Sequence, residues 1–392
     1  MKLCSKKIFL LISLAVISIC TTAQSSLSRV NFAYQFDPKA EIFVNSKAYT
    51  VSLDSVALTI SIFLNEESID LKNYKFQLKT SLGYTNPLEP VPFDSVYIGK
   101  RGNSYFLKFL TQKWPSNRVL VLEIESRFSS AKYYYDIQPV EVLPIDISDA
   151  GKVSITQSWV RPGEFNTNKS ATGLFYDYYF EPALPPMVTR APDPRKEMLV
   201  NSNITLTQSA PFNLSDEGLY LFQEDSLAQS AAPVLLVDRY FPKPAKLRQL
   251  IDPLIYITQK EEWESLDKDS VSKRDFDQFW LDITRSTDRA RKVIKTYYDR
   301  IEEANQFFTT YKAGWKTDKG MIYAIFGAPD RVIKGADKET WYYNATSISQ
   351  SIDFDFIRVN SIFSNNHYVL IRDRRYSNSW YQAINNLRKV RY

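Results

Sequence analysis

Two aspartates one residue apart, Asp353 and Asp355, are the pair in this sequence whose types and spacing best fit acid–base chemistry. In a strand expected over 351–359 they share one face, so their carboxyl groups would lie about 7 Å apart. Glycosidases hold two catalytic carboxyl groups about 5 to 10 Å apart. The same alternation is also typical of the wet face of a half-buried strand, with the apolar residues between turned inward. We therefore treat the pair as a candidate polar site and assign no catalytic residue.

Other kinds of catalytic and cofactor chemistry find little support in the residue types. The chain has one histidine, His367, so a Ser-His-Asp triad would have to use it, and we expect it to pack or to lie on the surface. Both cysteines, Cys4 and Cys20, lie within the first 20 residues, which leaves the rest of the chain without a thiolate for catalysis, disulfides or metal binding. The run from Gly99 to Gly102 has the composition of a hairpin turn and not of a phosphate loop. We therefore expect neither a cofactor nor a metal site.

The most specific segment lies late in the chain and runs Gly314-Trp315-Lys316-Thr317-Asp318. Gly314 follows a predicted helix, where a left-handed residue is commonly needed. Trp315 is expected to fold back as a large apolar anchor. Either Thr317 or Asp318 can cap a following helix by accepting backbone N–H bonds.

The segment after this pentad is expected to be a short helix over 321–326, although its Ile-Tyr-Ala-Ile sequence also suits a strand. Gly327 would end that helix, Pro329 would fix the next turn, and Asp330 suits the same turn. Trp341 follows in a predicted strand. The polar residues beside Trp315 offer either a recognition patch or a structural lock between two helices, and we favour the lock.

The elements around the pentad follow from residue spacing. From Phe276 to Tyr311 apolar residues recur in alternating steps of four and three, which predicts one buried helical face. Ser286-Thr287-Asp288 resembles a helix start, so we expect two helices with a bend there. Three antiparallel strands over 340–344, 351–359 and 368–372 and a last helix over 380–389 complete an α+β domain at 251–392.

Two β regions are expected before this domain. Residues 24–148 contain seven short runs rich in β-branched and aromatic residues between turn signals, which predicts an antiparallel sandwich. The runs are 32–36, 49–53, 57–64, 74–80, 104–110, 119–126 and 132–137. Residues 149–250 suggest a second, irregular β module, or an extension of the first sandwich. The predicted fold class is thus multidomain, β-rich plus α+β.

The pentad, with Ile325–Asp330 and Glu339–Tyr343 after it, resembles the GWxTD domain family of exported Bacteroidota proteins. The resemblance covers roughly residues 250–392. It departs at Lys319, where arginine is frequent, and at Ala328, where proline is frequent. It implies an exported envelope protein and no particular reaction. A weaker resemblance, over about 60 residues, is to the α+β module of BamE/SmpA-type outer-membrane assembly lipoproteins, an analogy of fold alone.

The N-terminus has the pattern of an export signal over residues 1–23. A basic start precedes an apolar stretch from Ile8 to Ile19, which is too short to span a bilayer, and small residues end at Ala23. Acylation of Cys20 is the alternative, but Ile19 is larger than the residue that usually precedes a lipidated cysteine. No later stretch is long and apolar enough to predict a membrane span.

Charge and short motifs bear on partners. The formal charge of +5 includes three signal lysines, so the mature chain is near neutral and a poor candidate for binding nucleic acid. The basic C-terminal end is either a solvated face or a contact for acidic glycans or anionic lipids. Asp-Ser followed by Val or Leu resembles an O-glycosylation site of exported Bacteroidota proteins and occurs at Ser55, Ser95, Ser226 and Ser270.

Together these features predict an exported protein of the periplasm, outer membrane or cell surface. The leading hypothesis is a non-enzymatic structural or protein-interaction component that binds another envelope protein. The alternative is a glycan-binding protein, or a carbohydrate hydrolase that uses Asp353 and Asp355.

Overall fold

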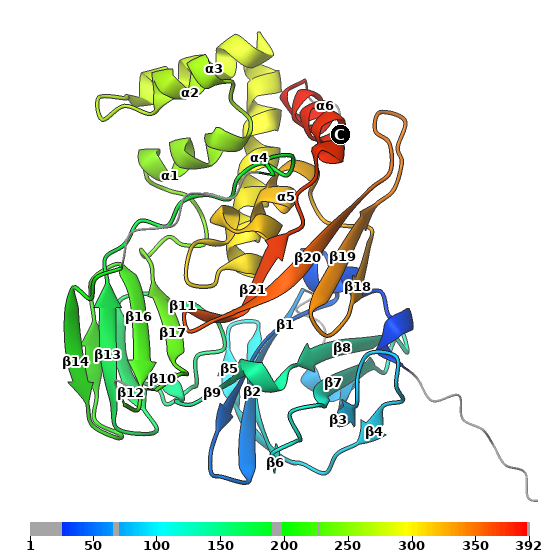
Figure 1. The fold of residues 1–392 in the computed structure, drawn as a ribbon, viewed down its shortest axis with the longest axis vertical. Coiled ribbons are helices and arrows are strands. Elements are labelled where there is room, and N and C mark those ends of the chain that lie inside the picture. Colours follow the sequence, from blue (N-terminus) through cyan, green and yellow to red (C-terminus); the bar gives the residue numbers. More distant parts are fainter. Residues whose placement is uncertain (1–25, 66–69, 190–197, 226–227, 390–392) are drawn as a thin grey trace, which may run out of the picture.

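The structure is a computed structural model that describes residues 26–65, 70–189, 198–225 and 228–389. The predicted signal peptide and Cys20 lie outside these residues. Figure 1 shows a helical layer above a C-terminal sheet, with two β-sandwiches below and beside it. The fold is mixed α+β and rich in antiparallel sheets, as the sequence predicts.

The N-terminal β region is a sandwich of two sheets whose inner faces share one apolar core that includes Ile60 and Leu122. One sheet has the order β5-β6-β2-β1-β9 and the other β4-β3-β7-β8. Their strands are β1 (Ile42–Thr50), β2 (Ser55–Leu64), β3 (Tyr74–Ser81), β4 (Glu89–Pro90), β5 (Asp94–Arg101), β6 (Ser104–Gln112), β7 (Val119–Ser126), β8 (Lys132–Ile137) and β9 (Val142–Leu143). All neighbours pair antiparallel except β9, which pairs parallel to β1.

Two predicted strands of this region are wrong. The run 49–53 overlaps β1 only at Tyr49 and Thr50, and residues 51–53 belong to the bend that leads into β2. Residues 32–36 form the 3-10 helix η2 (Phe32–Phe36), because the Asn31 side chain accepts the Ala33 N–H and caps a helical turn. Phe32 and Phe36 are buried against the C-terminal region instead of lying in the sandwich. The strand β5 was not expected, since most of its residues are exposed and show no apolar alternation.

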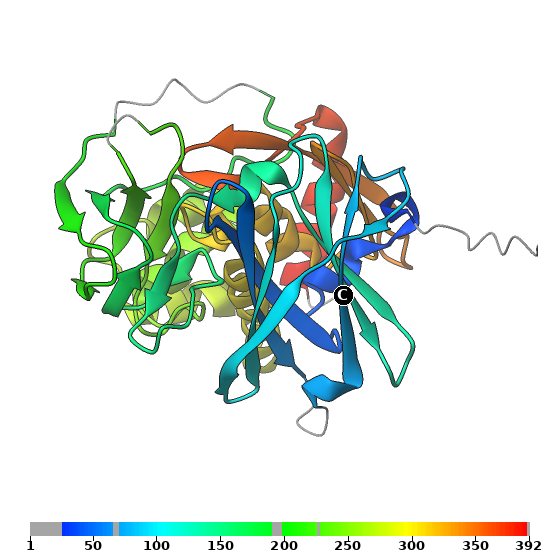
Figure 2. The same ribbon diagram turned by 90° about the horizontal axis from the view of Figure 1, so that it is seen from below.

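The second β region is a smaller sandwich, seen beside the first in Figure 2. Its sheets have the orders β10-β12-β15 and β11-β17-β16-β13-β14. The strands are β10 (Ile147–Asp149), β11 (Trp159–Val160), β12 (Gly163–Thr167), β13 (Ala171–Tyr176), β14 (Ser202–Leu206), β15 (Phe212–Leu214), β16 (Gly218–Gln223) and β17 (Ala232–Leu236). Between β10 and β12 the chain forms only an isolated bridge at Ser154 and the two-residue strand β11. The core of this region also contains Tyr49 and Ala57 of the first sandwich.

The helices follow in the order α1 (Leu247–Ile251), α2 (Lys260–Leu266), α3 (Lys273–Thr284), α4 (Thr287–Phe308), α5 (Asp318–Phe326) and α6 (Ser377–Arg388). The predicted bend between α3 and α4 is confirmed, and Arg285 makes it by adopting a left-handed conformation. The Ser286 side chain makes no capping hydrogen bond, so the expected cap is present in position only. Pro253 stops α1, after which the 3-10 helix η5 (Asp252–Tyr256) continues.

The C-terminal sheet has the order β18-β19-β20-β21 and is fully antiparallel. Its strands are β18 (Arg331–Lys334), β19 (Lys338–Tyr343), β20 (Ile352–Ser361) and β21 (Ser364–Leu370). The three expected strands are present, and β18 extends the sheet at one edge. Phe326 of α5 packs on Phe354 of β20 and on Trp380 of α6, so helices cover the inner face of the sheet.

The largest hydrophobic core joins the two ends of the chain. Leu27, Phe32 and Val121 of the N-terminal region share it with Tyr323 and Trp341 of the C-terminal region. The predicted domain boundaries therefore stay a prediction, because residues near the start of the described chain complete the C-terminal core.

Candidate functional site

The pentad connects α4 to α5 through the 3-10 helix η6 (Gly314–Lys316). The expected left-handed conformation of Gly314 is wrong, since its φ lies outside that region. Glycine is needed here for space: a Cβ would lie 1.9 Å from the Ala304 carbonyl oxygen on α4. Gly320 on α5 is equally close to the Gly314 carbonyl oxygen, at 1.9 Å. The two glycines let the turn pass between two helices that nearly touch.

Trp315 is the apolar anchor that the sequence predicts, with a buried ring that meets Tyr256 edge-on at 5.9 Å between centroids. Its backbone N–H donates to the Asn305 side-chain oxygen at 3.3 Å, and its carbonyl oxygen accepts the Tyr256 hydroxyl at 3.1 Å. The turn is therefore bonded on one side to α4 and on the other to η5.

Thr317, and not Asp318, caps α5. The Thr317 Oγ1 accepts the Gly320 N–H at 3.0 Å and donates to the Gly314 carbonyl oxygen at 2.7 Å. Asp318 instead forms an ion pair with Arg372 and accepts the Leu370 N–H at 2.9 Å. It thereby joins the first turn of α5 to the end of β21.

Lys319 is buried directly after the pentad. Its ammonium forms an ion pair of 2.9 Å with Glu339 and lies 3.6 Å from the Tyr368 ring centroid. Burial lowers the pKa of Lys319 to about 8, against the opposing attraction of Glu339. Burial alone would raise the pKa of Glu339, but Lys319 and Lys334 hold it below its ordinary value. A buried charge is retained only where a partner compensates for the lost water.

The remaining motif residues fix the turn from α5 into the sheet. Gly327 ends α5 with a φ of +81°, and its carbonyl oxygen accepts the Tyr343 hydroxyl at 2.9 Å. Pro329 is buried, and Asp330 accepts the Asn344 N–H at 2.7 Å. Trp341 is fully buried and its ring packs against those of Phe36, Phe308 and Phe356. These contacts join the start of the described chain to its C-terminal region.

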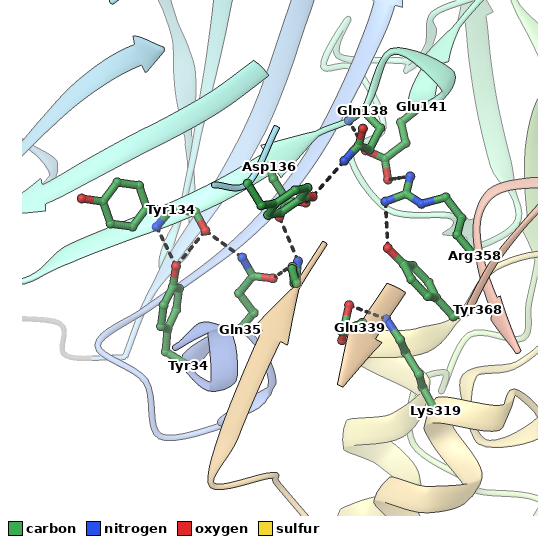
Figure 3. Close-up of polar contacts among 12 residues, drawn as sticks. Tyr34, Gln35, Tyr134, Asp136, Gln138, Glu141, Lys319, Glu339, Arg358 and Tyr368 are labelled. Carbon is green, nitrogen blue, oxygen red and sulfur yellow. Dashed lines mark hydrogen bonds and ion pairs between the residues drawn. The ribbon is translucent and has the colours of Figure 1, made fainter. Parts of the chain in front are cut away.

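A network of buried charges continues from Lys319 to the N-terminal sandwich (Figure 3). Lys334 of β18 pairs with Asp136 of β8 at 2.9 Å, and Arg358 of β20 pairs with Glu141 at 3.2 Å. Arg358 also donates to the Tyr368 hydroxyl at 2.7 Å, which closes the chain of contacts back to Lys319.

The two acidic groups that the N-terminal sandwich supplies differ in pKa. Burial alone would raise the pKa of Asp136, but Lys334 and the Tyr84 hydroxyl hold it below its ordinary value. Burial raises the pKa of Glu141, because the attraction of Arg358 offsets it only partly.

These side chains line a polar cavity of about 220 Å³ where the two sandwiches and the C-terminal region meet. His367 lines it too, with its ring 5.2 Å from that of Tyr311. Burial, together with the nearby Lys312, lowers the pKa of His367 to about 4. Sequence reasoning missed Lys334, Arg358, Asp136 and Glu141, since nothing local to each residue signals a partner so far along the chain.

The structure keeps Asp353 and Asp355 on the outer face of β20, away from this cavity. Asp353 pairs with Arg375 at 3.2 Å. Asp355 accepts the Thr340 hydroxyl at 2.7 Å and pairs with Lys338 at 2.9 Å. Burial alone would raise the pKa of Asp355, but these two partners hold it below its ordinary value.

The candidate glycosylation serines that the structure describes are accessible in different degrees. Ser95 and Ser270 are exposed, whereas Ser55 begins β2 and shares a hydrogen bond of 2.6 Å with Ser52. Ser226 lies outside the described residues. Modification at all four stays a prediction.

The described residues offer neither a metal-binding cluster nor a helix that could span a membrane. Within the described ranges, no group of three or more His, Cys, Asp or Glu side chains is arranged to hold a metal ion. No helix in the part of the chain that the structure describes combines the length and apolar character that crossing a membrane requires.

The fold and the hydrogen-bonded turn at 314–318 define a β-rich multidomain protein with an α+β C-terminal unit. Residues 218–389 match the family model of the GWxTD domain, so the chain carries a GWxTD domain. The match begins inside the second β region, earlier than the expected start near 250. The Bacteroidota origin and the likeness to BamE/SmpA modules stay predictions.

Other comparisons add little. No curated protein matches the chain in sequence. Among solved structures, a DUF4426 family protein from Pseudomonas aeruginosa PAO1 is similar with 12% identity, over 26% of this chain and 96% of that one, at a TM-score of 0.19. So low a score supports no conclusion about fold or function.

Proposed function

We propose that this protein is an exported component of the cell envelope that acts by binding another envelope protein and catalyses no reaction. The observation that carries the proposal is the commitment of the motif to internal contacts. Thr317 caps α5, Asp318 binds Arg372, and Lys319 binds Glu339. Side chains used in this way hold a fold together and are not free to act on a substrate.

The surface that best fits a protein partner is the outer face of the C-terminal sheet. Four large apolar side chains are exposed there or beside it: Tyr342 at 38%, Ile357 at 44%, Val359 at 41% and Ile371 at 42%. Ile371 continues beyond β21 and donates its N–H to the Asp355 carbonyl oxygen, so it lies next to β20. A cluster of exposed apolar side chains surrounded by charged residues is typical of protein–protein interfaces.

The alternative, a hydrolase that uses Asp353 and Asp355, has less support. A general acid needs a raised pKa so that it still holds its proton at neutral pH. The pKa of Asp355 is shifted the opposite way by Thr340 and Lys338. Both aspartates also have basic partners that a substrate would have to displace.

The test is in-cell cross-linking of the tagged full chain, followed by envelope fractionation and mass spectrometry. We expect stoichiometric recovery of one envelope protein, and loss of that cross-link in the double variant Ile357→Ser, Ile371→Ser. The matched control is Leu53→Ser, which alters a side chain 89% exposed on the first sandwich. Recovery of the chain alone, or a cross-link that survives the double variant, would contradict the proposal.

A further inference from the structure

A second cavity, of about 270 Å³, lies between the second sandwich and the pentad turn. Five of its lining residues are aromatic, among them Tyr179, Phe241 and Trp315. Charged residues of both signs also line the cavity: Lys243, Lys312 and Lys316, and Glu217, Asp238 and Asp252. This volume is just below the range of about 300 to 1,000 Å³ that is usual for small-molecule sites, so the cavity suits a ligand of about one ring. It is separate from the polar cavity at Lys319 and from the outer face of the sheet.

Lys316 is the unusual group in this cavity. Its ammonium lies 3.6 Å from the Tyr179 ring centroid and 5.5 Å from that of Trp315. Among the described residues it has no ion-pair or hydrogen-bond partner, although the side chain is only partly exposed. Burial lowers the pKa of Lys316 to about 8, and Asp252 offsets this only in part.

Two other sheltered cations near the motif are paired with carboxylates, and the Lys312 ammonium, in the same cavity, donates to the Glu181 carbonyl oxygen at 3.1 Å. Lys319 binds Glu339, and Arg372 binds Asp318. An aromatic ring attracts an ammonium but does not replace a counter-ion. The site at Lys316 is therefore built to receive an anionic group, and a carboxylate is the complement of a single ammonium.

The carboxylates in the same cavity restrict the chemical class of the ligand further. Asp238 is buried and accepts the Tyr240 N–H at 2.7 Å and a side-chain N–H of Gln249, while Asp252 pairs with Arg248, which does not line the cavity. Such groups repel a second anion but accept hydrogen bonds from hydroxyl groups. Aromatic walls take the apolar face of a ring. A hydroxylated ring with one carboxylate satisfies all three features at once.

We propose that this cavity binds an acidic sugar of the hexuronic acid class, with its carboxylate on Lys316, hydroxyl groups on Asp238 or Asp252, and its ring against Trp315 or Tyr179. The site requires no chemical step and does not depend on the protein-binding role. If the chain binds the sugar but no envelope protein, only the sugar site is supported. If it binds an envelope protein but no sugar, only the protein-binding role is supported.

The test is isothermal titration of the full chain without its signal, with glucuronate as the probe and glucose and acetate as comparisons, at pH 7. We expect saturable glucuronate binding at least tenfold tighter than either comparison. Lys316→Gln should weaken it at least tenfold, and Lys316→Arg should retain most of it. Lys338→Gln is the matched control, because it removes an exposed ammonium far from the cavity and should leave binding unchanged.

Each result has one meaning provided that the variants unfold at the wild-type denaturant concentration. Absence of saturable glucuronate binding would overturn the proposal. So would equal binding of glucose or acetate, or glucuronate binding that Lys316→Gln leaves unchanged.

Discussion

At the residue scale, Gly314 matters because of one missing carbon atom. Its Cβ position lies 1.9 Å from a backbone oxygen of α4, and backbone cannot move aside as a flexible side chain can. We expect Gly314→Ala to lower the free energy of unfolding by about 3 kcal/mol or more, at the upper end of overpacking effects. Urea denaturation measures the loss. Gly99→Ala is the control, since no atom lies within 4 Å of its Cβ position, and equal stability of the two variants would contradict the close approach.

His367 gives a second residue-scale prediction, on pH. Burial lowers its pKa from 6.5 to about 4, so between these values the unfolded chain binds a proton that the folded chain refuses. Stability from this group is present above pH 6.5 and falls as the pH drops towards 4, by up to about 3 kcal/mol. Because the chain has one histidine, a single imidazole signal in an NMR titration reports the pKa.

The control for this titration is His367→Gln, which should flatten the difference in stability between pH 6.5 and 4. Charged neighbours at Lys312, Asp318 and Lys319 remain in that variant, so subtracting the two pH profiles isolates the imidazole. An NMR pKa near the ordinary value of 6.5 would show that water reaches the ring.

At the element scale, α5 depends on the Thr317 side chain for its start. Thr317→Ala removes both the bond accepted from Gly320 and the bond donated to the Gly314 carbonyl oxygen. We expect a loss of about 1 to 2 kcal/mol, as for other threonine caps, and Thr317→Ser should recover most of it. Hydrogen exchange at the Gly320 amide is the direct measurement, and unchanged protection in Thr317→Ala would show that another group caps the helix.

Sequence alone could predict the helices and strands that are marked by neighbouring residues, such as a helix cap or an apolar alternation. The helix after the pentad, the break at Ser286 and the strand runs at 119–126 and 132–137 follow from caps and alternation, and the structure contains them. Residues 32–36 have strand composition, yet they form a helical turn that buries Phe32 and Phe36 in the core shared with the C-terminal region. Propensity is weak against such tertiary burial.

The site shows the same division between local and distant signals. The anchor role of Trp315 and the cap at Thr317 were predictable, whereas the reason for Gly314 was not, because Ala304 approaches it through the fold. The ion pair of Lys334 with Asp136 joins positions 198 residues apart, and no spacing rule reaches that far. Asp353 and Asp355 gave a stronger pattern in sequence than any of these, but their partners are ordinary surface bases.

At the scale of the whole molecule, the polar network is the charged part of the contact between the N-terminal sandwich and the C-terminal sheet. Its acidic members Asp136 and Glu141 come from the sandwich, and its basic members Lys334 and Arg358 come from the sheet. The apolar part of the same contact is the core that holds Leu27 and Phe32. Apolar burial supplies most of the stability of such a contact, while paired buried charges allow only one arrangement of the two regions without an unpaired charge.

Arg358→Met tests that role, because it keeps the apolar stem and removes the charge. The Arg358 side chain is 4% exposed and Glu141 is 17% exposed, so the variant leaves a sheltered carboxyl group without its cation. We expect a loss of about 3 to 5 kcal/mol, since breaking one partner of a buried pair strands the other. Calorimetry should also resolve two unfolding transitions, as the sandwich and the C-terminal region lose their fixed contact. Lys338→Met is the matched control on the same sheet, with a side chain 54% exposed and an expected loss below about 1 kcal/mol. If both variants unfold in one transition with the same midpoint, the network contributes nothing specific to the contact, and the apolar core alone joins the two regions.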